Sequence, residues 1–161
     1  MANYIGEFDC TVDAKGRMML PAGLLKQFAP ALKEKFVINR SVFQKCLVLN
    51  PMDAWDEIMK DLSKLNRFVK KNDDFIRQYN NGAVQVEVDA SNRILLPKRL
   101  MDYAKIEKEV VLTANLDKIE IWSAAMYDQV MNSYDPDGFA SLAEEVMGNK
   151  PANNDSKDAV S

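Results

Sequence analysis

Two short segments of the chain place an arginine four residues after an aspartate. The first contains Asp13 and Arg17, and the second contains Asp89 and Arg93. An arginine guanidinium is a permanently charged planar fork that can bind guanine O6 and N7, or a phosphate. Phosphates would repel the two aspartates, so we expect these carboxylates to orient the turn or the arginine instead. Both segments are therefore candidate DNA-binding loops.

The residues inside each segment indicate a tight turn. Gly16 allows a positive φ, and Asn92, of a residue type enriched at positive φ, stands at that place in the second segment. Lys15 adds a phosphate-directed charge to the first turn, where the second has the neutral Ser91. We predict DNA binding by Lys15, Arg17 and Arg93, and turn-organising roles for Asp13, Gly16, Asp89 and Asn92. From spacing alone, ordinary hairpin turns with solvated charges explain both segments equally well.

The two segments belong to an internal repeat. Residues 13–21 read DAKGRMMLP, and residues 89–97, displaced by 76 positions, read DASNRILLP. The apolar runs 36–38 and 47–49 similarly return as 110–112 and 119–121. Each copy is expected to form a strand, a turn, a second strand, a short helix, a hairpin and a helix.

Neither copy is large enough to fold well alone, because the β part of each is only about 45 residues. We therefore predict an α+β, β-rich fold in which the copies share one core, with strands of one pairing with those of the other about an approximate two-fold axis. The predicted parts are module 1 at 7–54, a connecting helix region at 55–82, module 2 at 83–126, C-terminal helices at 127–147 and a disordered tail at 148–161.

Proline and apolar spacing indicate where the helices lie. Pro21 and Pro97 favour helices over 22–29 and 98–104. Apolar residues at spacings of three and four predict an amphipathic helix over 51–80, with Asn72 as the place of an interruption. Its basic residues alternate with acidic ones, which is typical of a solvated helix face. A shorter helix is expected over 123–133, then a turn at 135–138 and one further short helix.

Composition weakens enzymatic interpretations of the chain. It contains no histidine, which excludes Ser-His-Asp and Cys-His nucleophiles and imidazole metal sites. Cys10 and Cys46 are isolated in apolar surroundings and are interpreted as buried small hydrophobes. We expect no catalytic residues, metal, cofactor or small-molecule substrate.

Charge restricts any DNA contact to a local surface. The net charge is −3, but residues 1–80 carry +3 (13 basic against 10 acidic) and residues 81–161 carry −6 (8 against 14). The first residues lack a secretory pattern, and we find no apolar stretch near the roughly 20 residues of a membrane span. A cytoplasmic, nucleoid-associated protein without a membrane partner is expected.

The motif D-x-x-G-R, followed by three apolar residues and proline, resembles the signature of SpoVT/AbrB-type swapped-hairpin DNA-binding proteins. Two copies at this spacing, over about residues 4–131, resemble the MraZ family. The resemblance implies an intramolecular pseudo-dimeric barrel with flanking helices. It also implies a homo-oligomeric ring that binds short direct repeats in promoter DNA of the division and cell-wall gene cluster, including its own gene. Two alternatives stay open: another AbrB-type regulator, and a ring-forming scaffold that does not bind DNA.

Overall fold

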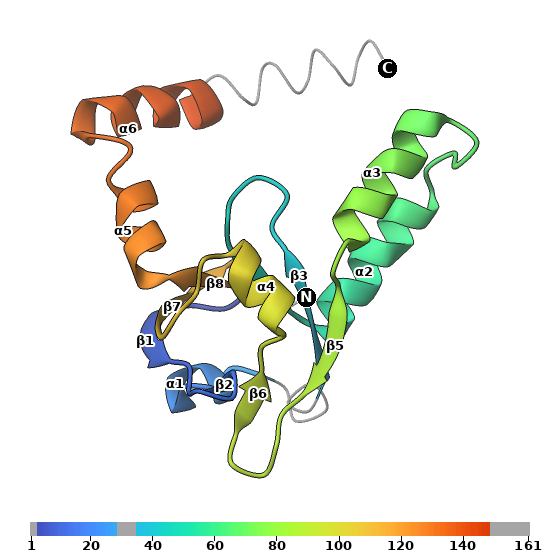
Figure 1. Ribbon diagram of the computed structural model, residues 1–161. Coiled ribbons are helices and arrows are strands. Elements are labelled where there is room, and N and C mark those ends of the chain that lie inside the picture. The colour runs from blue at the N-terminus through green and yellow to red at the C-terminus, as the bar shows by residue number, and fades with distance from the viewer. Residues whose placement is uncertain (1–2, 29–34, 149–161) are drawn as a thin grey trace. The chain divides into compact units, whose positions relative to one another are not determined.

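The computed structural model describes residues 3–28 and 35–148. Over residues 3–127 it contains strands and helices in alternation, so the predicted α+β class is confirmed (Figure 1). The strands are β1 (Glu7–Thr11), β2 (Arg17–Met19), β3 (Lys35–Arg40), β4 (Leu47–Pro51), β5 (Val84–Glu87), β6 (Arg93–Leu95), β7 (Glu109–Asn115) and β8 (Lys118–Ser123). The helices are α1 (Ala22–Leu25), α2 (Met52–Ser63), α3 (Lys70–Asn80), α4 (Lys98–Tyr103) and α5 (Ala124–Met131).

The strands of the two repeat copies pair with each other. A six-stranded antiparallel sheet has the order β1-β7-β8-β4-β3-β5, and β2 and β6 form a second, two-stranded sheet, here called the β2–β6 ribbon. Every strand has a partner in the other copy, as expected for a shared core. The described strands do not close into the barrel implied by the family resemblance. Strands β1 and β5 remain at opposite edges of the larger sheet because the chain leaves each edge to enter the ribbon.

The pairing scheme is unchanged when the two copies are exchanged. Phe8 of β1 lies opposite Leu112 of β7, and the equivalent residue of β5, Val84, lies opposite Ile38 of β3. The β2–β6 ribbon is centred on one pair, Met18 with Ile94. An approximate two-fold relation in the backbone pairing follows from these registers.

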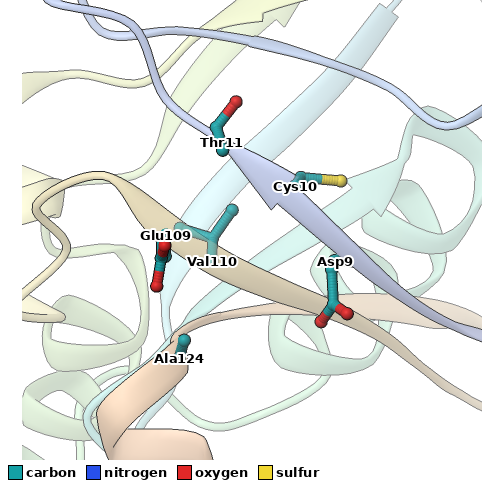
Figure 2. Close-up of a pocket in the computed structure, with 6 residues that line it drawn as sticks. All are labelled: Asp9, Cys10, Thr11, Glu109, Val110 and Ala124. Atoms are coloured by element: carbon teal, nitrogen blue, oxygen red, sulfur yellow. The ribbon is translucent and has the colours of Figure 1, made fainter.

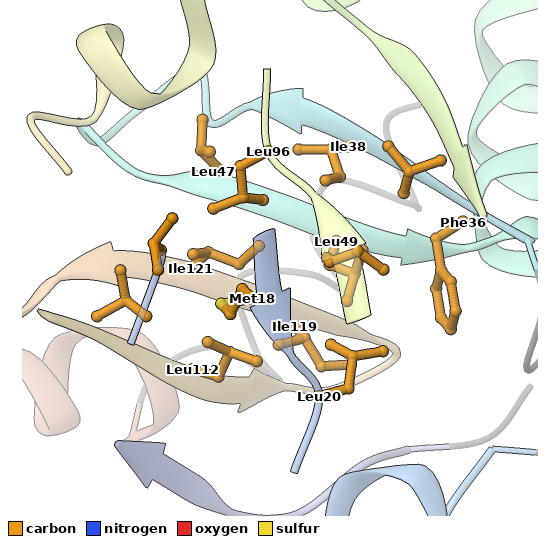
Figure 3. Packing of buried hydrophobic residues seen from close by; sticks show 14 of the residues in the cluster. Met18, Leu20, Phe36, Ile38, Leu47, Leu49, Leu96, Leu112, Ile119 and Ile121 are labelled. Carbon is orange, nitrogen blue, oxygen red and sulfur yellow. The ribbon is translucent and has the colours of Figure 1, made fainter. Parts of the chain in front are cut away.

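One hydrophobic core is built from both copies, and the ribbon lies at its centre. Met18 is 0% exposed and Ile94 is 1% exposed. Figure 3 shows Met18 among side chains from both hairpins, with those of β3 and β4 on one side and those of β7 and β8 on the other. The labelled neighbours from these four strands are Phe36, Ile38, Leu47, Leu49, Leu112, Ile119 and Ile121. Neither copy therefore encloses this core alone.

The helical segment between the copies differs from its prediction. It consists of two helices, α2 and α3, and the interruption falls at residues 64–69, so the prediction of a break near Asn72 was wrong. The cause is Asn66, whose side-chain oxygen accepts a hydrogen bond from the Phe68 N–H at 3.0 Å and folds the chain into a turn. Asn72 instead lies within α3, and its amide donates to the Asn66 carbonyl.

In the C-terminal segment, residues 128–148, a helix begins earlier than the sequence predicts. Helix α6 (Pro136–Ala143) begins inside the segment predicted as a turn, and a π-helical turn, η2 (Glu144–Gly148), follows it. Asp135 caps α6 by accepting from the Gly138 N–H at 2.6 Å, and Pro136 occupies the first helical turn. This combination favours a helix start. Apart from Gly148, the predicted disordered tail lies outside the described residues. The helix predicted over 22–29 is shorter than expected, because α1 ends at Leu25 and residues 26–28 form a turn.

The core position of the ribbon predicts that two adjacent methionines differ strongly in their contribution to stability. Met18→Ala is expected to lower the free energy of unfolding by about 2–5 kcal/mol, because it opens a cavity at the centre of the core. Met19→Ala, on the exposed side of the same strand, should change it by less than about 0.5 kcal/mol. Urea unfolding followed by circular dichroism measures both. Equal stability of the two variants would contradict the central role of the ribbon.

Candidate nucleic-acid interface

The first turn is organised by the carboxylate of Asp13. Its Oδ1 accepts hydrogen bonds from the backbone N–H groups of Lys15 and Arg17, both at 2.9 Å. Its Oδ2 accepts from Nε of Arg17 at 2.9 Å, so the same side chain folds the turn and holds the arginine. Gly16 has a φ of +86°, and a Cβ at this position would lie 3.0 Å from the Leu96 carbonyl oxygen. Both conformation and space therefore favour glycine here.

The second turn repeats this geometry with different residues. Asp89 accepts from the backbone N–H groups of Ser91 at 2.8 Å and Arg93 at 2.9 Å, and from Nε of Arg93 at 3.1 Å. Asn92 has a φ of 61°, which matches the left-handed conformation inferred from its position in the repeat. Replacement of Lys-Gly by Ser-Asn therefore preserves the backbone of the turn while removing one cation.

Each turn is also attached to the other copy. The Leu96 N–H donates to the carbonyl of Gly16 at 2.8 Å, and the Leu20 N–H donates to the carbonyl of Asn92 at 2.8 Å. These two bonds are equivalent under the repeat and extend the β2–β6 ribbon at both ends. The position of each arginine thus depends on the strands of both copies.

The two arginines keep donors available for a ligand. Their side chains are 34% (Arg17) and 31% (Arg93) exposed, and each uses its Nε for the aspartate. Within residues 3–28 and 35–148, the terminal Nη groups of these two arginines donate no hydrogen bond to the protein. An oriented guanidinium with free Nη donors can bind a base edge or a phosphate.

Lys98 lies beside the first turn, although it belongs to the second predicted module, at 83–126. A hollow of about 400 Å³ separates this turn from the start of α4, and Lys15 and Lys98 both line it, as do Asp13, Ala14, Gly16, Leu95, Leu96, Pro97, Met101 and Glu107. The repeat equivalent of Lys98 is Ala22, so the second turn has no corresponding lysine. Strand exchange between the copies therefore brings a second lysine to the first turn.

The charged side chains of α3 form exposed ion pairs within the helix. Nη2 of Arg77 lies 2.6 Å from Asp73, and Nζ of Lys70 lies 2.6 Å from Asp74. This is the solvated face that the sequence predicts. The two tryptophans contribute to packing: the ring of Trp55 lies against Tyr79, and that of Trp122 against Tyr127.

A second hollow, of about 440 Å³, lies beside β1 and does not involve the predicted site residues (Figure 2). Cys10 lines it together with Asp9 and Glu109. Burial, followed by the charge of Asp9, raises the pKa of the Cys10 thiol, while burial raises that of Cys46 to about 12. Cys46 is buried as predicted, whereas Cys10 is only half-buried. No metal-binding cluster of Asp, Glu, Cys or His occurs in the described part of the chain.

Both copies of the repeat match one known protein family. The family model described as MraZ protein matches residues 4–78 and 80–149. The chain belongs to the MraZ family. It is 52% identical over 149 residues to a protein of Christiangramia forsetii (92% of this chain, 96% of the relative). It is 48% identical to one of Flavobacterium psychrophilum (92% and 94%) and 37% identical to one of Cytophaga hutchinsonii (91% and 96%). All three relatives are named transcriptional regulator MraZ.

The MraZ match divides at residue 79, so its two parts each contain one Asp-x-x-x-Arg turn. The family named here agrees with the resemblance drawn from those turns. Among the described residues, no helix combines the length and apolar character needed to cross a membrane.

The hydrogen bonds within the turns predict a pH-dependent effect in this MraZ-family protein. The Arg17 backbone N–H, with further help from its guanidinium and from the Lys15 N–H, holds the pKa of Asp13 below its ordinary value. The ionised carboxylate therefore stabilises the fold fully above pH about 4, and this contribution is lost as pH falls through the lowered folded pKa. Asp13→Asn should accordingly be less stable than wild type at pH 7 and equally stable in strong acid.

Urea midpoints of both proteins, measured from pH 7 down to pH about 2, test this. The control is Asp61→Asn on α2, which removes an exposed pair with Lys64 at 3.6 Å and should have no measurable effect. A difference between wild type and Asp13→Asn that persists unchanged in acid would contradict the assigned role of the carboxylate.

Proposed function

We propose that this MraZ-family protein is a sequence-specific DNA-binding transcriptional regulator that contacts promoter DNA through Arg17 and Arg93. The observation that carries the proposal is the pair of guanidinium groups on one ribbon, each oriented by an aspartate and each with free Nη donors. Two such groups fixed on a rigid scaffold can read base edges without first ordering their side chains. The proposed setting is the cytoplasm, in association with the nucleoid.

The charge distribution supports an unequal contact by the two turns. Lys15 and Lys98 both flank the first turn, whereas Ser91 and Ala22 stand at the equivalent positions of the second. We therefore assign additional phosphate contacts to the first turn. This local cationic surface is compatible with the net charge of −3, which disfavours binding by the molecule as a whole.

The proposed target follows from the family resemblance. It consists of short direct repeats upstream of the division and cell-wall gene cluster, including the gene of this protein. We further propose that the modules at 7–54 and 83–126 act as one swapped-hairpin pseudo-dimer. A catalytic role is not part of the proposal, since no pair of the described turn residues supplies a nucleophile with a base.

Arg17→Ala is expected to lose specific DNA binding, with affinity for promoter DNA falling at least about tenfold, while the melting curve stays close to wild type. Fluorescence anisotropy with DNA from upstream of the protein's own gene, at low salt, measures the affinity. Arg77→Ala is the matched control, because Arg77 is also exposed and paired with an aspartate four residues earlier. Its DNA binding should be unchanged. Equal affinities of both variants would contradict the assigned role of Arg17, and absence of DNA binding by the wild-type protein would favour the scaffold alternative.

A homo-oligomeric ring is also proposed, because one subunit offers few DNA contacts. Two arginines and two lysines give a small footprint for the affinity of about 10⁻⁸ M typical of specific regulators. Several subunits on neighbouring repeats would make each later contact effectively intramolecular. Exposed apolar side chains at the turn between α2 and α3, with Phe68 100% exposed, offer surface for such an interface.

Particle mass from light scattering, combined with titrations of DNA carrying one, two and three repeats, tests the oligomer. We expect a multimeric particle whose affinity rises with the number of repeats. A monomeric particle with full affinity, or equal affinity for one and three repeats, would refute the proposal.

A further inference from the structure

The exposed face of the β2–β6 ribbon carries two apolar side chains that the core does not use. Met18 and Ile94 point into the core, so the alternation of a strand turns their neighbours outward. These neighbours are Arg17 and Met19 on β2, and Arg93 and Leu95 on β6. Met19 is 59% exposed and Leu95 is 55% exposed. Each exposed apolar side chain thus shares its strand and its face with an arginine.

The arrangement of these four side chains is two-fold related. Arg17 lies opposite Leu95 in the ribbon, and Met19 lies opposite Arg93. Met19 and Leu95 occupy the same position in the repeat, 76 residues apart. The face therefore consists of two equivalent pairs, each with one guanidinium and one apolar group side by side. Both copies have an apolar residue where packing alone would accept a polar one.

The size and charge of this face fit double-stranded DNA. Two paired strands are about 5 Å apart, and a ribbon of this width can enter a major groove about 12 Å wide. Lys15 and Lys98 line the hollow next to Leu95, together with Asp13 and Glu107, so two lysines lie beside the apolar surface on the side of the first turn. An apolar protein partner fits less well, because it would bury both guanidinium groups without a new acceptor.

We propose that Met19 and Leu95 contact the 5-methyl groups of thymines in the major groove, beside the bases or phosphates bound by the arginines. The thymine methyl is the apolar feature of the major groove, and it distinguishes thymine from cytosine. The inference rests on the proposed DNA-binding function and adds a second kind of base contact to it. The arginines supply charge and hydrogen bonds, while Met19 and Leu95 select positions that carry a methyl group.

The test replaces thymine by deoxyuracil, which removes only the methyl group. A binding sequence is first selected from a random double-stranded DNA pool with the full-length wild-type protein. Each thymine of that sequence is then replaced singly, and affinities are measured by fluorescence anisotropy. We expect at least two replacements to weaken wild-type binding, each by about fourfold, the value for one buried methyl-sized group.

Three variants link this loss to particular side chains. Met19→Gln and Leu95→Gln keep side chains of similar length, and each should bind the thymine sequence more weakly and lose its sensitivity to one of the replacements. Leu116→Gln is the matched control, since Leu116 is 69% exposed at the turn between β7 and β8. This control should retain wild-type affinity and wild-type sensitivity. Melting curves of all three variants should match wild type, because the replaced side chains are exposed.

The outcomes separate this inference from the function on which it rests. Binding that depends on Arg17 but is indifferent to every replacement would overturn the methyl contact and leave the DNA-binding function standing. Unchanged sensitivity in both Met19→Gln and Leu95→Gln would overturn it equally. A selected sequence without thymine would do the same. Absence of any selected DNA would overturn both proposals.

Discussion

The central pairing of Met18 with Ile94 is the contact on which the rest of the structure depends. Each residue comes from a different repeat copy, and each is buried between hairpins of both copies. If the two copies separated, this apolar cluster would be exposed to water. Neither copy could bury it again alone, because each has too little apolar surface to enclose a core. The same ribbon continues into both Asp-x-x-x-Arg turns, through the carbonyls of Gly16 and Asn92. Fold stability and arginine position therefore depend on one short ladder.

The ion pairs of the turns serve orientation more than stability. Solvent screens these exposed Asp–Arg pairs, so Asp13 and Asp89 add little to the stability of the global fold. By binding Nε, however, each carboxylate holds the guanidinium and leaves the Nη groups without a hydrogen bond to the described part of the protein. A side chain held in this way loses less conformational entropy when it binds a ligand. In the proposed function, the aspartates thus act on DNA recognition through the arginines.

The repeat made much of this structure predictable. Asp, Gly or Asn, and Pro at fixed positions predicted the turns and the helix starts, and the apolar runs predicted the strands of both hairpins. These features depend on local conformational preferences, which residue type expresses directly. The Asp–Arg contact was predictable too, because only three residues separate its partners and the turn brings them together.

Long-range features were not predictable in this way. Lys98 lies near the first turn because the two copies exchange strands. The local sequence of α4 does not indicate this exchange. The edges of the larger sheet, which leave it open, depend on how β1 and β5 enter the ribbon. The break between α2 and α3 followed the side chain of Asn66, one of several asparagines in a polar segment. The outward orientation of Met19 and Leu95 follows only from the burial of Met18 and Ile94, which the structure shows.

Covalent linkage of the copies has a consequence for how recognition can diversify. In a homodimer built from identical chains, any substitution in the turn appears twice, and both half-sites must accept it. Here Lys15 and Ser91, or Lys98 and Ala22, differ while the backbone pairing stays two-fold. The molecule consequently has a head and a tail along its ribbon, despite its nearly symmetrical scaffold. A DNA-binding protein with such polarity can distinguish the two directions along a duplex, which identical subunits related by a perfect two-fold axis cannot do.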